Sequence, residues 1–176
     1  MHFAIDPGSC HMNKREYVEE FVKRGIDSGA DSIKFQLFPD IPDYTSSGNI
    51  LLSRENFEHA FKLAPDKVTA SCFDKKSFDY YLSLRPKYVK FAFSRRDYTH
   101  WIRQAIEAQI PVVVTCTLWD DIDDQVLKLV TGIENNKTLY PNPYMMDFSG
   151  LFPEYFQGYS DHSIGWHNAY QSKLAG

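Results

Sequence analysis

Short apolar runs alternate with longer amphipathic stretches along this chain, and that alternation restricts the fold more than any other feature of the sequence. Strands are predicted at residues 3–6, 32–38, 68–73, 88–93, 112–117 and 157–162. Helices, predicted from apolar residues three and four apart, lie between them at residues 14–28, 54–64, 75–84, 97–108 and 164–175. Strands that alternate with helices imply right-handed crossovers and a parallel sheet.

Two helix ends have recognisable capping residues, while one region stays ambiguous. Ser53, with Asn56, offers the chemistry of a helix start. Gly29 is placed to end the first helix in the left-handed conformation. Farther along, DDIDDQ is either a stunted helix followed by a strand at 126–130, or part of one helix that runs through Leu129. The YPNPY segment is predicted to be an irregular loop because of its prolines.

A doubly wound sheet and a closed barrel share this pattern of elements. Several predicted strands are apolar on both alternating faces, as buried parallel strands are. Each strand also finishes in a hydroxyl, charged or cysteine side chain, and barrel enzymes keep their chemistry at the carboxyl ends of their strands. We therefore predict an α/β fold, a parallel (β/α) TIM-type barrel, as a single domain over residues 1–176.

Composition excludes several classes of protein. The net charge of −4 gives no reason to expect nucleic acid or an acidic membrane as partner. No run of about 18 apolar residues suggests a membrane span, and the first residues do not pattern as a signal peptide. Three widely spaced cysteines, Cys10, Cys72 and Cys116, favour a reducing, cytoplasmic setting. A thiolate metal cluster is conceivable, but small buried hydrophobes are the simpler interpretation.

Two lysines stand inside β-rich runs, Lys34 in SIKFQ and Lys90 in YVKFA. A lysine in a buried strand is costly unless it is paired; the alternative is an edge strand from which the lysine reaches outward. Because alternate strands of a barrel fill the same layer, both ammonium groups are placed to converge on one anion. Hydroxyls near strand ends would add neutral donors to that anion, from Ser71, Thr115 and Ser160.

Polar residues at other strand ends leave their roles open. His162 follows a predicted strand beside Asp161, and His11 follows the first strand in the same manner. A lone histidine is more often structural than a ligand. Asp6 ends the first strand, where it either caps the turn around Pro7 and Gly8 or acts as a general base or sugar-binding carboxylate.

Several motifs resemble those of the sialic acid synthase family, in the family's order and over nearly the whole chain. GADSIKFQLF is similar to the family's GADAVKFQ, GYSDHSIG to its GYSDHTLG, and YPNPY to its YP-x-PY loop. Weaker matches are GSCH for GSNH, ASCF for STPF, YVKFAFS for FKIASG and PVVVTCT for PVILSTG.

This resemblance implies a TIM barrel that condenses phosphoenolpyruvate with an N-acylated amino sugar such as N-acetylmannosamine, giving a nonulosonic acid. A divalent metal, Mn²⁺ or Mg²⁺, would activate the sugar aldehyde as a Lewis acid. The implied phosphoenolpyruvate ligands are Lys34, Ser71, Lys90, Thr115 and Ser160. Gln36 and Tyr140 would face the sugar, His162 would hold the metal, and Asp6 falls where the family has its catalytic glutamate.

The chain also departs from the family pattern. Asp6 is one methylene shorter than the glutamate, Cys10 replaces an asparagine, and Arg95 replaces an acidic residue, with the serine there shifted to Ser94. The family's second metal histidine lies on the eighth strand, which the sequence to Gly176 does not reach. We therefore expect about seven of eight strands, no carboxyl-terminal antifreeze-like domain, impaired activity, and a homo-oligomer that covers the open edges.

Two other functions remain open from the sequence. A non-catalytic barrel remnant that binds a sugar or a phosphate is favoured by Asp6 and Arg95, whereas Lys34, Lys90 and His162 favour the enzyme. A different phosphoenolpyruvate-dependent aldol synthase is the third candidate, and the KFQ and SDH motifs argue against it.

Overall fold

The computed structural model describes residues 2–37, 50–92, 99–116, 131–135, 156–160 and 167–175, which fall into two compact units. The first unit comprises residues 2–90 with 107–111, and the second residues 91–106 with 112–175. Each unit combines parallel strands with helices.

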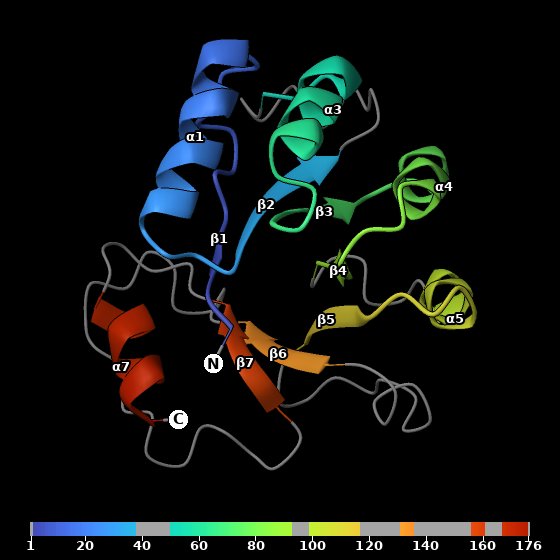
Figure 1. The fold of residues 1–176 in the computed structure, drawn as a ribbon. Helices are drawn as coiled ribbons and strands as arrows, with labels where there is room; N and C mark the ends of the chain where they lie inside the picture. Colours follow the sequence, from blue (N-terminus) through green and yellow to red (C-terminus); the bar gives the residue numbers. More distant parts are fainter. Residues whose placement is uncertain are drawn as a thin grey trace. The chain divides into compact units, whose positions relative to one another are not determined.

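The first unit is a parallel sheet whose strands pair in sequence order (Figure 1). Its strands are β1 (Ala4–Ile5), β2 (Ser32–Leu37), β3 (Val68–Cys72) and β4 (Val89–Phe91), the last of which joins through Val89 and Lys90. Its helices are α1 (Arg15–Asp27), α3 (Arg54–Leu63) and α4 (Lys75–Ser83). Figure 1 shows α1 and α3 side by side, and Glu19 of α1 bonds to His59 of α3 at 2.7 Å.

Side chains alternate between two chemically different faces of this sheet. The apolar face holds fully or nearly fully buried residues from the central strands, namely Ile33, Phe35, Leu37, Val68, Ala70, Cys72 and Val89. The register places the polar residues together on the opposite face: Lys34 beside Thr69, Gln36 beside Ser71, and Ser71 beside Lys90. β2 and β3 are therefore not among the strands expected to be apolar on both faces, because one face of each is built of polar side chains.

Aromatic rings fill the space between the apolar face and the helices. Phe57 of α3 packs edge-on against Phe35 of β2, with ring centroids 6.5 Å apart, and against Tyr81 of α4 at 5.8 Å. All three side chains are fully buried. The Tyr81 hydroxyl also accepts from the Ala70 amide at 2.8 Å and donates to the Tyr88 carbonyl at 3.0 Å, so it links β3 to the segment that leads into β4.

The predicted helix ends are confirmed. The Ser53 hydroxyl accepts from the Asn56 amide at 3.2 Å at the start of α3. Gly29 follows α1 with φ of +80°, a conformation that glycine adopts without strain. The Asp74 carboxylate caps α4 in the same way as Ser53 caps α3, by accepting from the Ser77 amide at 3.0 Å.

The second unit contains α5 (Thr99–Glu107), β5 (Val112–Cys116), β6 (Thr131–Asn135), β7 (Phe156–Ser160) and α7 (His167–Ala175). β5 pairs with β6, and β6 with β7, both in parallel. The pairing of β6 with β7 has a register shift at Gly132 and Ile133. Strand β6 lies directly after the expected 126–130, so its position was not predicted; that segment, like the YPNPY loop, lies outside the described residues.

The architecture is an α/β fold of parallel strands and helices, consistent with a partial TIM barrel. The total of seven strands, and the single domain over residues 1–176, stay predictions, since 117–130 and 136–155 lie outside the described residues. None of the helices in the described ranges is long and apolar enough to cross a bilayer.

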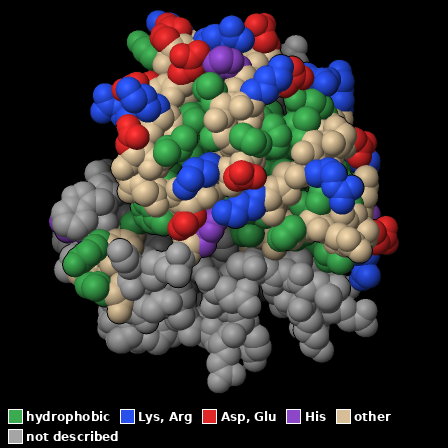
Figure 2. Space-filling view, in the orientation of Figure 1, with side chains coloured by type: hydrophobic (Ala, Val, Ile, Leu, Met, Phe, Trp, Pro, Cys, Tyr) green, Lys and Arg blue, Asp and Glu red, His purple; other side chains and the backbone are tan. Residues whose placement is uncertain are grey.

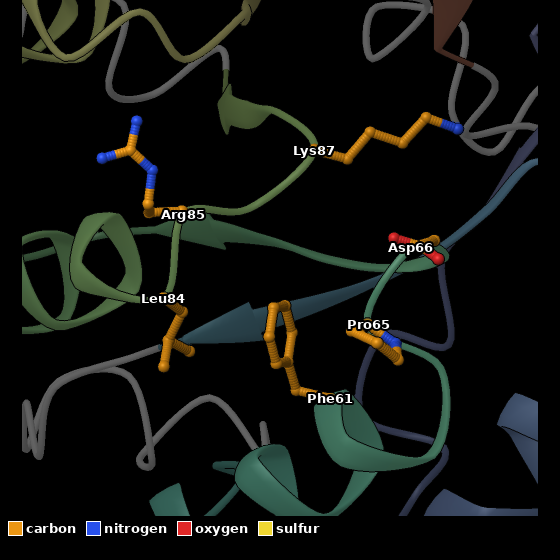
Figure 3. Close-up of a pocket in the computed structure, with 6 residues that line it drawn as sticks. All are labelled: Phe61, Pro65, Asp66, Leu84, Arg85 and Lys87. Atoms are coloured by element: carbon orange, nitrogen blue, oxygen red, sulfur yellow. The ribbon is translucent and has the colours of Figure 1, made fainter.

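A hollow of about 390 Å³ lies where the chain enters β3 and β4 (Figure 3). It is lined by Phe61, Pro65, Asp66, Leu84, Arg85 and Lys87. Lys87 extends away from Phe61 in Figure 3, and its ammonium donates to the Asp31 carbonyl at 3.4 Å. The hollow is therefore at the amino ends of the strands, opposite the end where barrels carry their chemistry.

Figure 2 shows the outer surface over α1, α3 and α4. Acidic and basic side chains are interspersed among hydrophobic ones over the described part of this face. The described part of this face therefore presents no field of one sign to an anionic ligand.

Gly25 sets how closely α1 approaches β2, and its replacement by alanine should destabilise the first unit. A Cβ at this position would lie 2.5 Å from Cγ1 of Ile33. Overpacking of this kind costs about 1–3 kcal/mol, which exceeds the gain of about 1 kcal/mol from better helix propensity. Urea unfolding of Gly25→Ala should show a lower midpoint, whereas Lys23→Ala on the exposed face of the same helix should not. An unchanged midpoint for Gly25→Ala would show that α1 shifts without cost.

Candidate anion-binding site

Lys34 forms a partly buried ion pair with Asp6 on the polar face of the sheet. Its ammonium nitrogen lies 2.5 Å from Oδ2 of the carboxylate, and the Lys34 side chain is only 10% exposed. This pairing resolves the alternatives for Lys34, because a lysine buried in a strand is stabilised by an opposite charge and here does not reach outward.

Asp6 takes part in three contacts at once. Besides Lys34, its Oδ1 accepts from the Gly8 amide at 3.0 Å, as predicted for a residue that caps this turn, and Gln36 donates to Oδ2 at 3.4 Å. Burial alone would raise the pKa of Asp6, but the Lys34 ammonium and the Gly8 amide outweigh it and hold the pKa below its usual range. The carboxylate is therefore ionised at neutral pH and already occupied by donors.

Ser71 presents a buried hydroxyl that has no hydrogen-bond partner among the described residues. The residue is 1% exposed, and its register places it between Gln36 of β2 and Lys90 of β4. Buried polar atoms are rarely left unpaired, and such an atom marks a position for an absent ligand or water. Ser71, Lys34 and Lys90, predicted together from the sequence, do lie on one face of one sheet.

Lys90, unlike Lys34, forms no ion pair in the part of the chain that the structure describes. Burial, together with repulsion from the Lys34 ammonium, lowers the pKa of Lys90 to about 7, and the more remote Asp6 opposes this only in part. The site therefore holds one lysine in an ion pair and a second whose charged form is disfavoured.

A hydrogen-bonded layer closes the site on the side of the amino ends of the strands. The Tyr88 hydroxyl bonds to the Ser32 hydroxyl at 2.9 Å, and Thr69 donates to it at 3.2 Å. His2 adds a bond from its Nε2 to Ser32 at 2.9 Å. This layer was not predicted from the sequence, although Ser32 and Thr69 lie two residues before Lys34 and Ser71 and therefore face the same side of their strands.

His11 and Cys10 lie in the loop after β1. His11 is 1% exposed, its Nδ1 accepts from the Asn13 amide at 2.9 Å, and burial lowers its pKa. Its observed contacts are thus those of a structural residue. Cys10 is exposed and Cys72 buried, so the interpretation of the cysteines as small buried hydrophobes holds for Cys72 and is wrong for Cys10.

Other predicted site residues are described only in part or not at all. The backbone of Thr115 pairs with Ile133, and that of Ser160 with Asn135, which places both on strands as predicted. Tyr140, His162, Ser94 and Arg95 lie outside the described residues.

The described residues around Asp6 do not fit a divalent metal. No group of three potential metal ligands occurs in the ranges that the structure covers. The nearest carboxylate is already bound to an ammonium group, and a second lysine faces the same site. These donors suit an anion rather than a cation.

Comparison with protein-family models gives no match, and neither does comparison with curated protein sequences. Solved structures do match. The N-acetylneuraminic acid (sialic acid) synthetase of Leptospira borgpetersenii serovar Hardjo-bovis, in complex with citrate, superposes with a TM-score of 0.75 at 14% identity. The match covers 99% of this chain and 69% of that one. The chain has the fold of a sialic acid synthase.

Two further structures give similar fits. The spore coat polysaccharide biosynthesis protein spsE of Bacillus subtilis matches with a TM-score of 0.62 at 15% identity, over 76% of this chain and 43% of that one. A spore coat polysaccharide biosynthesis protein E from Chromobacterium violaceum gives 0.63 at 18% identity, over 80% and 50%. These proteins belong to the group that the sequence motifs resemble, and at such low identity the likeness shows the fold.

Replacing each lysine by methionine should change stability in opposite directions. Lys34→Met removes the partner of the Asp6 carboxylate, whose side chain is 37% exposed, so solvent screens part of the loss and the first unit should be destabilised by about 1–3 kcal/mol. Lys90→Met should stabilise it by about 1–4 kcal/mol at neutral pH, because folding disfavours the charged amine. The folded pKa of Lys90, about 7, lies below the usual 10.5, so the unfolded chain binds more protons between these values and the gain should shrink as pH rises.

Urea unfolding at about pH 7 and about pH 10 measures both effects. Both variants replace a lysine by an uncharged side chain of similar length. Equal destabilisation by both substitutions would show that Lys90 has a carboxylate partner in the folded protein.

Proposed function

We propose that this chain carries the phosphoenolpyruvate site of a sialic acid synthase-type enzyme, which condenses phosphoenolpyruvate with an N-acylated amino sugar to a nonulosonic acid. The observation that carries the proposal is the gathering of Lys34, Lys90 and the unpartnered Ser71 hydroxyl on one sheet face. A phosphate and a carboxylate on one small substrate need cations and neutral donors in this arrangement. The fold shared with the Leptospira synthetase supports the same assignment.

The remaining parts of the proposal come from the motifs. Thr115 and Ser160 would add hydroxyls to the same anion, Gln36 and Tyr140 would face the sugar, and His162 would hold Mn²⁺ or Mg²⁺. The metal would polarise the sugar aldehyde. A homo-oligomer stays part of the proposal as well.

A second function, binding without turnover, is favoured by the contacts of Asp6. Its carboxylate is bound by Lys34 and by the Gly8 amide, so a proton acceptor at this position has to release a donor first. Phosphate release from phosphoenolpyruvate in the presence of N-acetylmannosamine and Mn²⁺ separates the two functions: release supports the synthase, and binding without release supports the remnant.

Calorimetric titration of phosphoenolpyruvate, with and without Mn²⁺, tests the site. Ser71→Ala should weaken binding by about ten- to a hundredfold, since a hydrogen bond to a charged group contributes about 1.5–3 kcal/mol. It should leave folding intact, because the hydroxyl has no hydrogen-bond partner in the described ranges of the chain. Lys34→Ala should abolish binding.

Ser77→Ala is the matched control, since Ser77 lies on α4 and supplies only its backbone amide to a cap. Undiminished binding by both Ser71→Ala and Lys34→Ala would place the anion elsewhere.

Binding of the anion should weaken as pH rises through neutrality. A phosphate beside Lys90 favours the charged amine, so binding raises the pKa of Lys90 above about 7 and takes up a proton. Affinity should therefore fall by about tenfold from about pH 7 to about pH 8.5. Lys90→Arg, which stays charged, should lose most of this dependence. A wild-type affinity that does not change over this interval would show that Lys90 does not contact the anion.

A further inference from the structure

The two lysines of the site differ in whether the amine is held as an ammonium group in an ion pair, and this decides whether it can react as a nucleophile. Lys34 is committed to a carboxylate at 2.5 Å, and an ammonium in an ion pair is not a nucleophile. No ion pair to Lys90 is found in the part of the chain that the structure describes, and its neighbour across the β3–β4 pairing is the unpartnered hydroxyl of Ser71. One face thus combines a fixed cation, a free hydroxyl donor and an amine.

We propose that Lys90 captures small α-keto acids as an imine, an activity that does not depend on phosphoenolpyruvate binding or on condensation. The neutral amine is the reactive form, and a lysine becomes neutral when it is desolvated or placed beside another cation. Both conditions are met at Lys90. With the pKa near 7 instead of 10.5, it holds about a thousandfold more neutral amine at neutral pH than an ordinary lysine does.

The step is balanced without a cofactor. The Nζ lone pair attacks the keto carbon and forms the C–N bond while the C=O π bond opens. One amine proton passes to the keto oxygen to give a carbinolamine, the second follows, and that oxygen leaves as water as the imine forms. The Ser71 hydroxyl, beside Lys90, is placed to donate to the carboxylate or to the carbinolamine oxygen. Nothing is oxidised or reduced until an external hydride is added.

The same groups define the class of ligand. A carboxylate next to the carbonyl is drawn to a face that carries Lys34 and the Ser71 hydroxyl. The Tyr88, Ser32 and Thr69 layer lies on the amino-end side of these groups. Pyruvate is the smallest common molecule of the α-keto acid class. An aldehyde or ketone without a carboxylate would lack this attraction.

The pH response also distinguishes capture from simple anion binding. The charged groups that face Lys90 in the described strands are Lys34 on β2 and Asp6 on β1, and β3 presents the uncharged Ser71 and Thr69. Capture needs the neutral amine and should therefore increase from about pH 6 to about pH 8, the opposite of the trend for phosphate binding.

Reductive trapping tests the proposal on the full chain. The protein is incubated with pyruvate and sodium cyanoborohydride, and peptide mapping by mass spectrometry locates the reduced adduct. Lys90 should be labelled at least about tenfold faster than Lys34 or the exposed Lys23. Lys90→Arg should abolish the fast label, and Ser71→Ala should slow it several-fold while remaining folded by circular dichroism. Acetone, which lacks the carboxylate, should label Lys90 more slowly than pyruvate.

Labelling of Lys90 no faster than that of Lys23, or a rate that does not rise with pH, would overturn the proposal. Excess phosphoenolpyruvate in the reaction separates this proposal from the function proposed above. Labelling that phosphoenolpyruvate blocks supports both, labelling that it does not block supports capture alone, and titratable phosphoenolpyruvate binding without labelling supports the synthase site alone.

Discussion

The first unit depends on the alternation of side chains across a parallel sheet. Every second residue of β2 and β3 faces the helices and is apolar, and the residues between them are polar and face the other way. The apolar half supplies the core that holds α1, α3 and α4 in place. The polar half is buried as well, so its groups require partners, and their pairing determines what chemistry the face can support.

The polar face divides into two layers of different character. Toward the amino ends lies the hydrogen-bonded layer of Ser32, Thr69, Tyr88 and His2. One step toward the carboxyl ends lie Asp6, Lys34, Ser71 and Lys90. Among the described residues, Lys34 and Asp6 form an ion pair, the Ser71 hydroxyl has no hydrogen-bond partner, and Lys90 has no ion pair. A satisfied layer beneath an incomplete one is the arrangement of a preorganised binding site.

Much of this was predictable from the sequence. The positions of β2, β3, α1 and α3 follow from apolar periodicity and from the caps at Ser53 and Gly29, since these signals are local. The shared face of Lys34, Ser71 and Lys90 follows from their places in successive strands. The bond between Lys34 and Asp6 was not predicted, because a contact across 28 residues depends on the register of β1 with β2. The low pKa of Lys90 depends on burial and on that same pairing, neither of which a single sequence displays.

Gly25 has a consequence for how such a chain diverges. Because Gly25 has no side chain, α1 packs closely against Ile33, the residue directly before Lys34. The position of the helix is therefore coupled to the strand that carries the lysine. The outward side of α1 is exposed and carries none of the site residues described above, so substitutions there should be tolerated. Gly25 is different, because a side chain at this position would push α1 away from the sheet. Relatives of such a protein can therefore lose nearly all recognisable identity along this helix and still deliver a lysine to the same place on the sheet.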